Sequence, residues 1–113
     1  MGGKSRNKGK VGEREFSTEL NLLLGLETRR GCQFKGTPDS PDVVGWPGVY
    51  IEVKRREKIN VDKFMAEAAA EAGDDIPLVA TRRNRGEWLL TIKLKDLLPF
   101  AHEIIIQDRR GQK

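Results

Sequence analysis

Two acidic residues near the middle of the chain lie at a spacing that suits metal-dependent chemistry. Asp42 follows a proline, and nine residues separate it from Glu52, Val53 and Lys54. In a strand successive side chains alternate between faces, so Glu52 and Lys54 would point the same way, roughly 7 Å apart. Two carboxylates on adjacent strands suit Mg²⁺, which takes oxygen ligands and keeps several waters. A lysine beside them would orient water or offset phosphate charge, so the pattern predicts metal-assisted phosphodiester hydrolysis.

The neighbouring residues predict a hairpin that brings the two acids together. Residues 42–44 are typical of a short strand, and residues 49–54 of a longer one rich in β-branched residues. Trp46, Pro47 and Gly48 between them favour a tight connection. A loop rich in glycine and proline precedes Asp42 and leads from an extended segment over residues 26–30. We therefore expect Asp42 and Glu52 to lie near each other on paired strands.

A first helix is expected from about Val11 to Leu24, ended by Gly25. Its apolar residues form one stripe at helical spacing, and Glu13 lies at the near end of that stripe. An unpaired carboxylate beside a core-facing stripe is costly, unless it borders a site that holds a metal or a basic group. The alternative is a first-turn acid that the helix dipole favours. The stripe consists of Phe16, Leu20, Leu23 and Leu24.

The remaining segments predict one α/β domain over residues 11–113. Asn60 is a good cap for a helix that Gly73 would end. Residues 76–81 and 88–92 predict two antiparallel strands joined by a turn at 84–86, followed by a short helix at 95–98 and a strand at 104–106. The expected architecture is a mixed central β-sheet flanked by helices.

Charge is concentrated at the start of the chain. The first ten residues carry four basic side chains and no acid, which equals the net charge of +4 of all 113 residues. We expect residues 1–10 to be a flexible basic arm whose Lys8 and Lys10 contact a polyanion, the alternative being a solvated tail. The lone Cys32 excludes an internal disulfide. Without a predicted membrane span or signal peptide, a cytoplasmic protein is expected.

These residues together give the chain a family resemblance. It resembles the PD-(D/E)xK nucleases, which have a restriction-endonuclease-like core, and within them the small archaeal-type Holliday junction resolvases and their phage relatives. The resemblance covers roughly residues 8–100. The matching residues are Lys8-Gly9, Gly12-Glu13-Arg14-Glu15, Arg30-Gly31, Asp42-Val43-Val44 and Ile51-Glu52-Val53-Lys54.

The resemblance implies a homodimer that cleaves branched DNA with Mg²⁺ or Mn²⁺ and needs no small-molecule cofactor. It implies that Asp42, Glu52 and the main-chain carbonyl of Val53 bind the metal, and that Glu13 completes the site directly or through water. Lys54 would position the attacking water or steady the charge of the transition state. Contacts to DNA phosphates are expected from Arg14, Arg30 and Ser40.

Other basic residues lie beside the expected site. Arg55 and Arg56 follow it on the same strand, and further arginines occupy the turn at 82–85. We expect Arg55 and Arg56 to contact nucleic acid, the alternative being a solvated rim. The wider superfamily often has a glutamine on the next helix, and Glu67 occupies a comparable place here. The candidates for a dimer interface are apolar: Trp46, Phe64, Met65, Trp88, Leu97, Phe100 and residues 104–106.

Two other functions remain open from the sequence. One is a nuclease that acts on duplex or flapped DNA in repair, packaging or restriction. The other is a non-catalytic DNA-binding subunit that keeps the nuclease fold. The intact set of acids with Lys54 argues against the second, since a degenerate site would be expected to lose a ligand.

Overall fold

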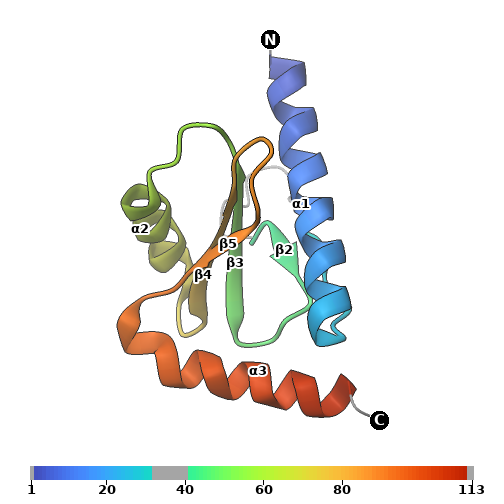
Figure 1. Ribbon diagram of the computed structural model, residues 1–113. Helices are drawn as coiled ribbons and strands as arrows, with labels where there is room; N and C mark the ends of the chain where they lie inside the picture. Colours follow the sequence, from blue (N-terminus) through green and yellow to red (C-terminus); the bar gives the residue numbers. More distant parts are fainter. Residues whose placement is uncertain (1, 32–40, 112–113) are drawn as a thin grey trace.

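A computed structural model describes residues 2–31 and 41–111, with the backbone alone for residues 2–8 and 108–111. Nine elements follow one another along these residues (Figure 1). They are α1 (Gly2–Leu24), β1 (Arg29–Arg30), β2 (Val43–Val44), β3 (Val49–Arg55), α2 (Val61–Ala72), β4 (Ile76–Arg82), β5 (Leu89–Thr91), the 3₁₀ turn η1 (Leu94–Asp96) and α3 (Leu97–Gly111).

The five strands form one mixed sheet in the order β1-β2-β3-β4-β5. β1, β2 and β3 are antiparallel neighbours, and β5 is antiparallel to β4. β3 and β4 are parallel over seven residue pairs, and α2 supplies the crossover that a parallel pair requires. The predicted mixed sheet flanked by helices is confirmed.

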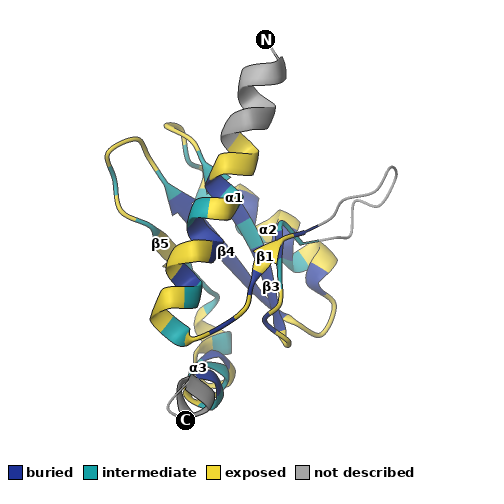
Figure 2. Ribbon diagram, turned by 90° about the vertical axis from the view of Figure 1, so that its right-hand side faces the viewer, coloured by how far each residue is buried: buried dark blue, intermediate teal, exposed yellow. Residues whose placement is uncertain are grey.

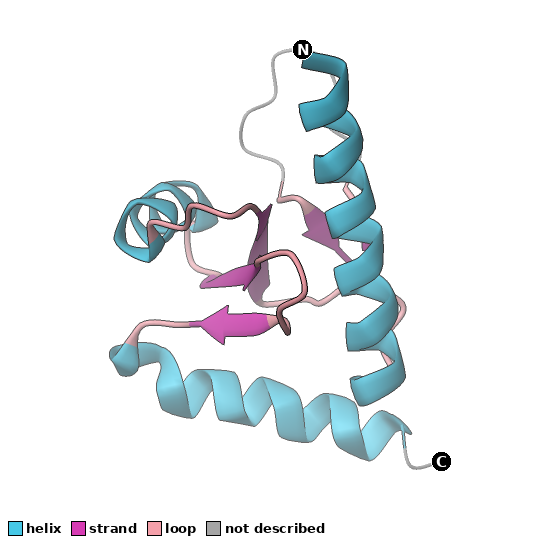
Figure 3. Cartoon of the chain, turned by 45° about the horizontal axis from the view of Figure 1, so that its top comes forward, coloured by secondary structure: helices cyan, strands magenta, loops and turns pink. Residues whose placement is uncertain are grey.

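Helices cover both faces of this sheet (Figure 3). α1 and α3 contribute Phe16, Leu20 and Phe100 to a cluster with Ile51 and Leu78 of the central strands. On the other face α2 packs Phe64, Ala68 and Ala72 against Tyr50 and Val79. β3 and β4 are accordingly largely buried, whereas β5 at the sheet edge is largely exposed (Figure 2).

Local sequence signals account for the second helix. The Asn60 side chain accepts a hydrogen bond from the Lys63 N–H at 3.1 Å, which satisfies a donor that the first turn of α2 leaves unpaired. Gly73 ends the helix with a φ of 61°. The predicted cap and end of this helix are both confirmed. Among the described helices, none combines the length and the apolar composition that a membrane span requires.

Two segments differ from the sequence-based expectation. α1 begins at Gly2 instead of about Val11, so the backbone of residues 2–10 is helical, because each residue added to an existing helix gains a hydrogen bond without a new nucleus. The predicted strand at 104–106 is wrong, since these residues belong to α3. Phe100, Ile104 and Gln107 lie at helical spacing and pack inward, and this contact overrides the strand preference of three consecutive isoleucines.

Candidate active site

Asp42 is held against β3 by its backbone and its side chain together. Its N–H donates to the carbonyl of Ile51 at 3.0 Å, and its own carbonyl accepts from the Gly31 N–H at 2.8 Å. Its carboxylate accepts a hydrogen bond from the Val53 N–H, with 2.9 Å between nitrogen and Oδ2. The short pairing of β2 with β3 therefore fixes this carboxylate beside residues 51–53, as the predicted hairpin requires.

Glu52 and Lys54 lie on the face of β3 that α2 covers. Ile51 and Val53 alternate with them and belong to the core under α1. The ammonium of Lys54 lies 5.1 Å from the centre of the Phe64 ring of α2, a distance typical of a cation–π contact. The side chain of Lys54 is thus held at the edge of the core, and its charged end remains accessible from the pocket described below.

The carboxyl groups of Asp42 and Glu52 interact directly. The pKa of Glu52 is raised from its ordinary value of 4.5 to about 8, mainly by burial and further by a hydrogen bond to Asp42 and by the charge of Asp42. The charge of Lys54 acts in the opposite direction. Two carboxyls pressed together in this way favour either a shared proton or a cation between them. Their arrangement therefore fits a divalent ion held by two carboxylates and several waters.

Glu13 reaches the same region from α1 but is bonded to a cation of the protein. Its Oε1 lies 3.1 Å from Nε of Arg30 on β1. Burial and the charge of Asp42 raise the pKa of Glu13, whereas Arg30 lowers it. Within residues 2–31 and 41–111 no group of three or more acidic, histidine or cysteine side chains is arranged to hold a metal ion. Asp42 and Glu52 are consequently the core of the candidate site, with Glu13 at its margin.

A pocket of about 710 Å³ opens where these residues meet. It lies between the N-terminal half of α1 and the end of β3, so it is lined by a helix, a strand end and the loop that follows. Its lining mixes both signs of charge, which suits an anion brought to a bound cation. The predicted residues in the lining are Glu13, Asp42, Val53, Lys54, Arg55 and Arg56.

The predicted DNA contacts have different surroundings. Lys10, Arg14 and Arg56 are exposed. Arg30 is paired with Glu13, and Nε of Arg55 lies 2.9 Å from the carboxylate of Glu15. Ser40 and the side chain of Lys8 lie outside the described residues.

Sequence reasoning missed three acids around the site. Glu57 lines the pocket, and Glu15 of α1 binds both Arg55 and Arg82. Glu71 of α2 accepts a hydrogen bond from the Tyr50 hydroxyl at 2.7 Å, and its charge helps to raise the pKa of Glu52. The sequence comparison singled out Glu67 on α2. Glu71 lies one turn further along the same helix, so helical spacing could have identified it as a second candidate.

Comparison with known proteins finds a likeness to a solved structure. The chain matches no family model, and no curated protein is similar to it in sequence. Its fold is similar to that of Hjc, a Holliday junction resolvase of the archaeal hyperthermophile Archaeoglobus fulgidus. The TM-score is 0.45 at 22% identity, and the match covers 69% of this chain and 73% of that one.

Proposed function

We propose that this protein is a divalent-metal-dependent endonuclease that hydrolyses DNA phosphodiesters. The observation that carries the proposal is the contact between the carboxyls of Asp42 and Glu52, beside a pocket that Asp42 and Lys54 line. A structural role does not require two acids to be held together at a cost in free energy. A divalent cation between them would remove that cost without the shared proton, so the arrangement suits a metal site.

Each predicted catalytic or metal-binding residue has a role in this proposal. A divalent ion would lower the pKa of a bound water and would bind a non-bridging phosphate oxygen. Asp42 and Glu52 hold that ion, assisted by the Val53 carbonyl, and Glu13 orients a water at the margin of the site. Lys54 positions the attacking water or offsets the charge that develops on the phosphate. Mg²⁺ and Mn²⁺ are the expected ions because all these ligands are oxygens.

Four-way junctions are the proposed substrate, on the strength of the sequence motif from Lys8 to Lys54. Symmetric resolution requires two cuts related by a two-fold axis, and therefore a homodimer. Several predicted interface residues belong to the protomer core instead: Trp46, Phe64 and Phe100 are each less than a tenth exposed. A better candidate is the exposed apolar surface along the edge strand β5, η1 and the start of α3. Its exposed residues are Leu89, Leu90, Leu94, Leu97 and Leu98.

Cleavage of end-labelled DNA tests the proposal. Four-way junction, splayed duplex and linear duplex are incubated with the protein in Mg²⁺ or in EDTA. Paired symmetric nicks on the junction, absent in EDTA, are the expected result. Asp42→Asn and Glu52→Gln should lose cleavage and keep binding, because affinity comes mainly from basic residues. Glu67→Gln is the matched control, since it removes an exposed acid outside the pocket.

The other outcomes point to the alternative functions. Equal cutting of linear duplex would make the protein a general nuclease of repair, packaging or restriction. Tight binding without cutting of any substrate would favour a DNA-binding subunit. Unchanged turnover by Asp42→Asn or Glu52→Gln would contradict the assignment of the site.

A further inference from the structure

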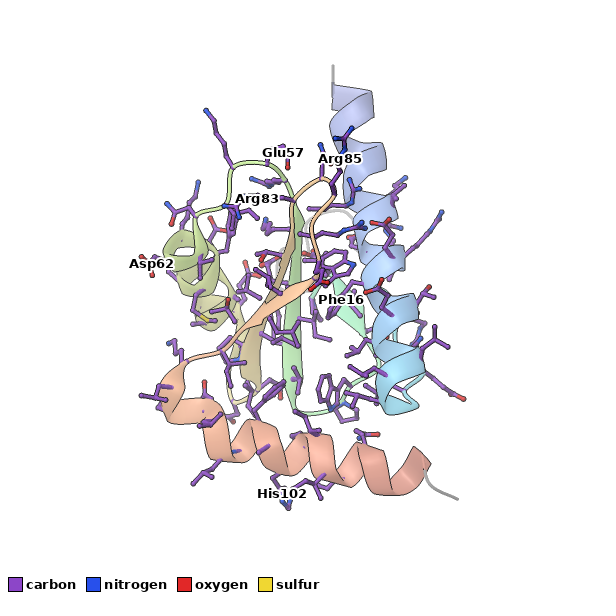
Figure 4. The ribbon with its side chains drawn as sticks, in the orientation of Figure 1. Phe16, Glu57, Asp62, Arg83, Arg85 and His102 are labelled. Carbon is purple, nitrogen blue, oxygen red and sulfur yellow. The ribbon has the colours of Figure 1, made fainter. Side chains whose placement is uncertain are left out.

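The β4–β5 hairpin carries arginines at the same end of the molecule as the candidate site. Its tip spans residues 82–86 and lies beside the loop from β3 to α2 and the N-terminal half of α1, whereas α3 with His102 lies at the opposite end (Figures 1 and 4). Figure 4 shows Arg83 and Arg85 near Glu57, which also lines the pocket. The hairpin tip is therefore next to the pocket rim.

Hydrogen bonds fix the tip to that rim. Arg83 donates from Nε to the main-chain carbonyl of Glu57 at 3.1 Å, and the N–H of Asn84 donates to the Glu57 carboxylate at 2.8 Å. At the base of the hairpin the Trp88 ring packs on Phe16 of α1, with 5.2 Å between ring centres. The tip is held from two sides, so its side chains are presented in a defined position relative to the pocket.

The arginines of the hairpin differ in how their charge is used. Arg82 is bound to the Glu15 carboxylate at 3.2 Å and to the Gly86 carbonyl at 2.8 Å, so its charge is compensated within the protein. Arg83 has a neutral carbonyl as its partner. In the described part of the chain neither Arg83 nor Arg85 forms an ion pair with a carboxylate. Two positive charges are thus available to an external anion.

The backbone at Arg85 supports a role for this side chain. Its φ of 62° is in the left-handed region, and it is the one residue other than glycine with a positive φ among those described. A glycine would fit this position with less strain, and the next residue, Gly86, does not have a positive φ. An arginine in a conformation that favours glycine suggests that its charge has a use.

We propose that Arg83 and Arg85 form a second phosphate-binding site for the DNA backbone, which holds a strand beside the pocket. The inference rests on the proposed function, because it takes DNA as the anion. The site positions the duplex and does not read its sequence, since guanidinium contacts to phosphates carry no base information. Its position next to Glu57 would let one DNA segment contact the hairpin and the pocket together.

The expected effect is on affinity and on its salt dependence. Each lost phosphate contact reduces the slope of log affinity against log salt by about 0.9, so loss of both should reduce it by about 2. At about 0.1 M salt, binding should weaken by roughly tenfold or more. Cleavage at saturating protein should remain, because neither arginine lines the pocket.

Binding of fluorescently labelled four-way junction in EDTA tests the inference. The variant is Arg83→Ala with Arg85→Gly, and Arg85→Gly alone is a second variant, since glycine fits the backbone there and thermal unfolding should show no loss of stability. The control for Arg85→Gly is Lys63→Ala, which likewise removes one exposed positive charge, on α2 and outside the pocket. Weaker binding and a smaller salt slope in the arginine variants alone would support the site.

The possible failures are distinguishable. Suppose that the wild-type protein binds DNA, and that the arginine variants bind it as tightly as the wild type or lose no more affinity than the lysine variant. The second phosphate-binding site is then wrong, and the proposed function stands. If the wild-type protein binds no DNA, the proposed function fails and this inference fails with it.

Discussion

The guanidinium of Arg30 binds the carboxylate of Glu13, with 3.1 Å between Nε and Oε1. The pair joins β1 to α1 beside Asp42. Glu13 is expected to complete the metal site, and Arg30 is expected to contact a DNA phosphate. Arg30 lowers the pKa of Glu13 against the effects of burial and Asp42. In this structure Arg30 therefore helps to keep Glu13 ionised.

Removal of Arg30 should raise the pKa of Glu13. In Arg30→Gln the opposing effects of burial and of the Asp42 charge act without compensation, so Glu13 should hold its proton to a higher pH. An NMR titration of the Glu13 carboxyl carbon measures the change directly. Arg29→Gln is the control, because Arg29 is the neighbouring exposed arginine. An unchanged titration midpoint in Arg30→Gln would contradict the pairing.

Glu52 should make the stability of the metal-free protein fall with rising pH. Its pKa is about 8 in the folded protein and near 4.5 in an unfolded chain. Between these values the folded protein keeps a proton that the unfolded chain has released, so the free energy of unfolding decreases as pH rises through this window. Below about pH 4.5 the contribution is fully present, and above about pH 8 it is lost.

Thermal unfolding of the wild-type protein and Glu52→Gln in EDTA measures this effect. The difference in free energy of unfolding between Glu52→Gln and the wild type should shift in favour of the variant by about 1–2 kcal/mol from about pH 5 to pH 9, after a discount for partial solvent access. Mg²⁺ should restore the stability of the wild-type protein near pH 9, because a ligand that binds the folded state stabilises that state. Parallel pH profiles of the two proteins would contradict the shifted pKa; Glu67→Gln is the control.

Lys54 should matter more for cleavage than for binding. Its ammonium lies over the Phe64 ring and in the lining of the pocket, whereas the proposed phosphate contacts come from other residues. Lys54→Ala should reduce the single-turnover cleavage rate by about 10²- to 10⁴-fold, the range typical of a lost proton-transfer or water-positioning group. The dissociation constant for DNA should change by less than about threefold. Equal losses in rate and affinity would make Lys54 a binding residue.

The sequence predicted the elements that local patterns determine. Strand alternation placed Glu52 and Lys54 on one face, and this is what β3 shows. Turn residues placed Asp42 at the start of the neighbouring strand; it lies directly before β2 and bonds to Ile51 of β3. The strand predicted at residues 104–106 was wrong because β-branched residues favour strands locally, while contacts of Phe100 and Ile104 with the core favour a helix.

Long-range partners could not be predicted in the same way. Glu13 binds an arginine 17 residues away, and Glu15 binds Arg82, which is 67 residues away. Periodicity tells which face of a helix a residue occupies, but it does not tell which side chain of another element lies opposite. The ion pairs that hold α1 to the sheet were therefore visible only in the structure.

The exposed leucines near α3 should mediate dimerisation. Leu94 and Leu98 are 84% and 80% exposed, although burial of a leucine side chain is favourable. Leu94→Glu with Leu98→Glu should convert a dimer into a monomer, as measured by light scattering during gel filtration. Leu22→Glu with Leu23→Glu is the control, because these α1 leucines are similarly exposed. Dissociation in the α1 variant alone would move the interface to α1.

Two glycines of α1 should respond in opposite ways to replacement by alanine. A Cβ at Gly9 would meet no atom within 4 Å, whereas a Cβ at Gly12 would lie 3.0 Å from Cβ of Arg55 on β3. Gly9→Ala should therefore stabilise the protein by up to about 1 kcal/mol, which is the difference in helix propensity. Gly12→Ala has the same propensity gain but forces α1 away from β3.

The displacement in Gly12→Ala should also affect the site. Arg55 of β3 is held by Glu15, which lies on α1 with Gly12, so Arg55 has little room to shift. The added methyl group must therefore displace α1, and Glu13 moves with the helix. We expect Gly12→Ala to be less stable than Gly9→Ala in urea unfolding, and to cleave DNA more slowly than the wild type. Equal stability of the two variants would mean that β3 yields to the added methyl group, and the close approach of α1 would then be unnecessary for the geometry of the pocket.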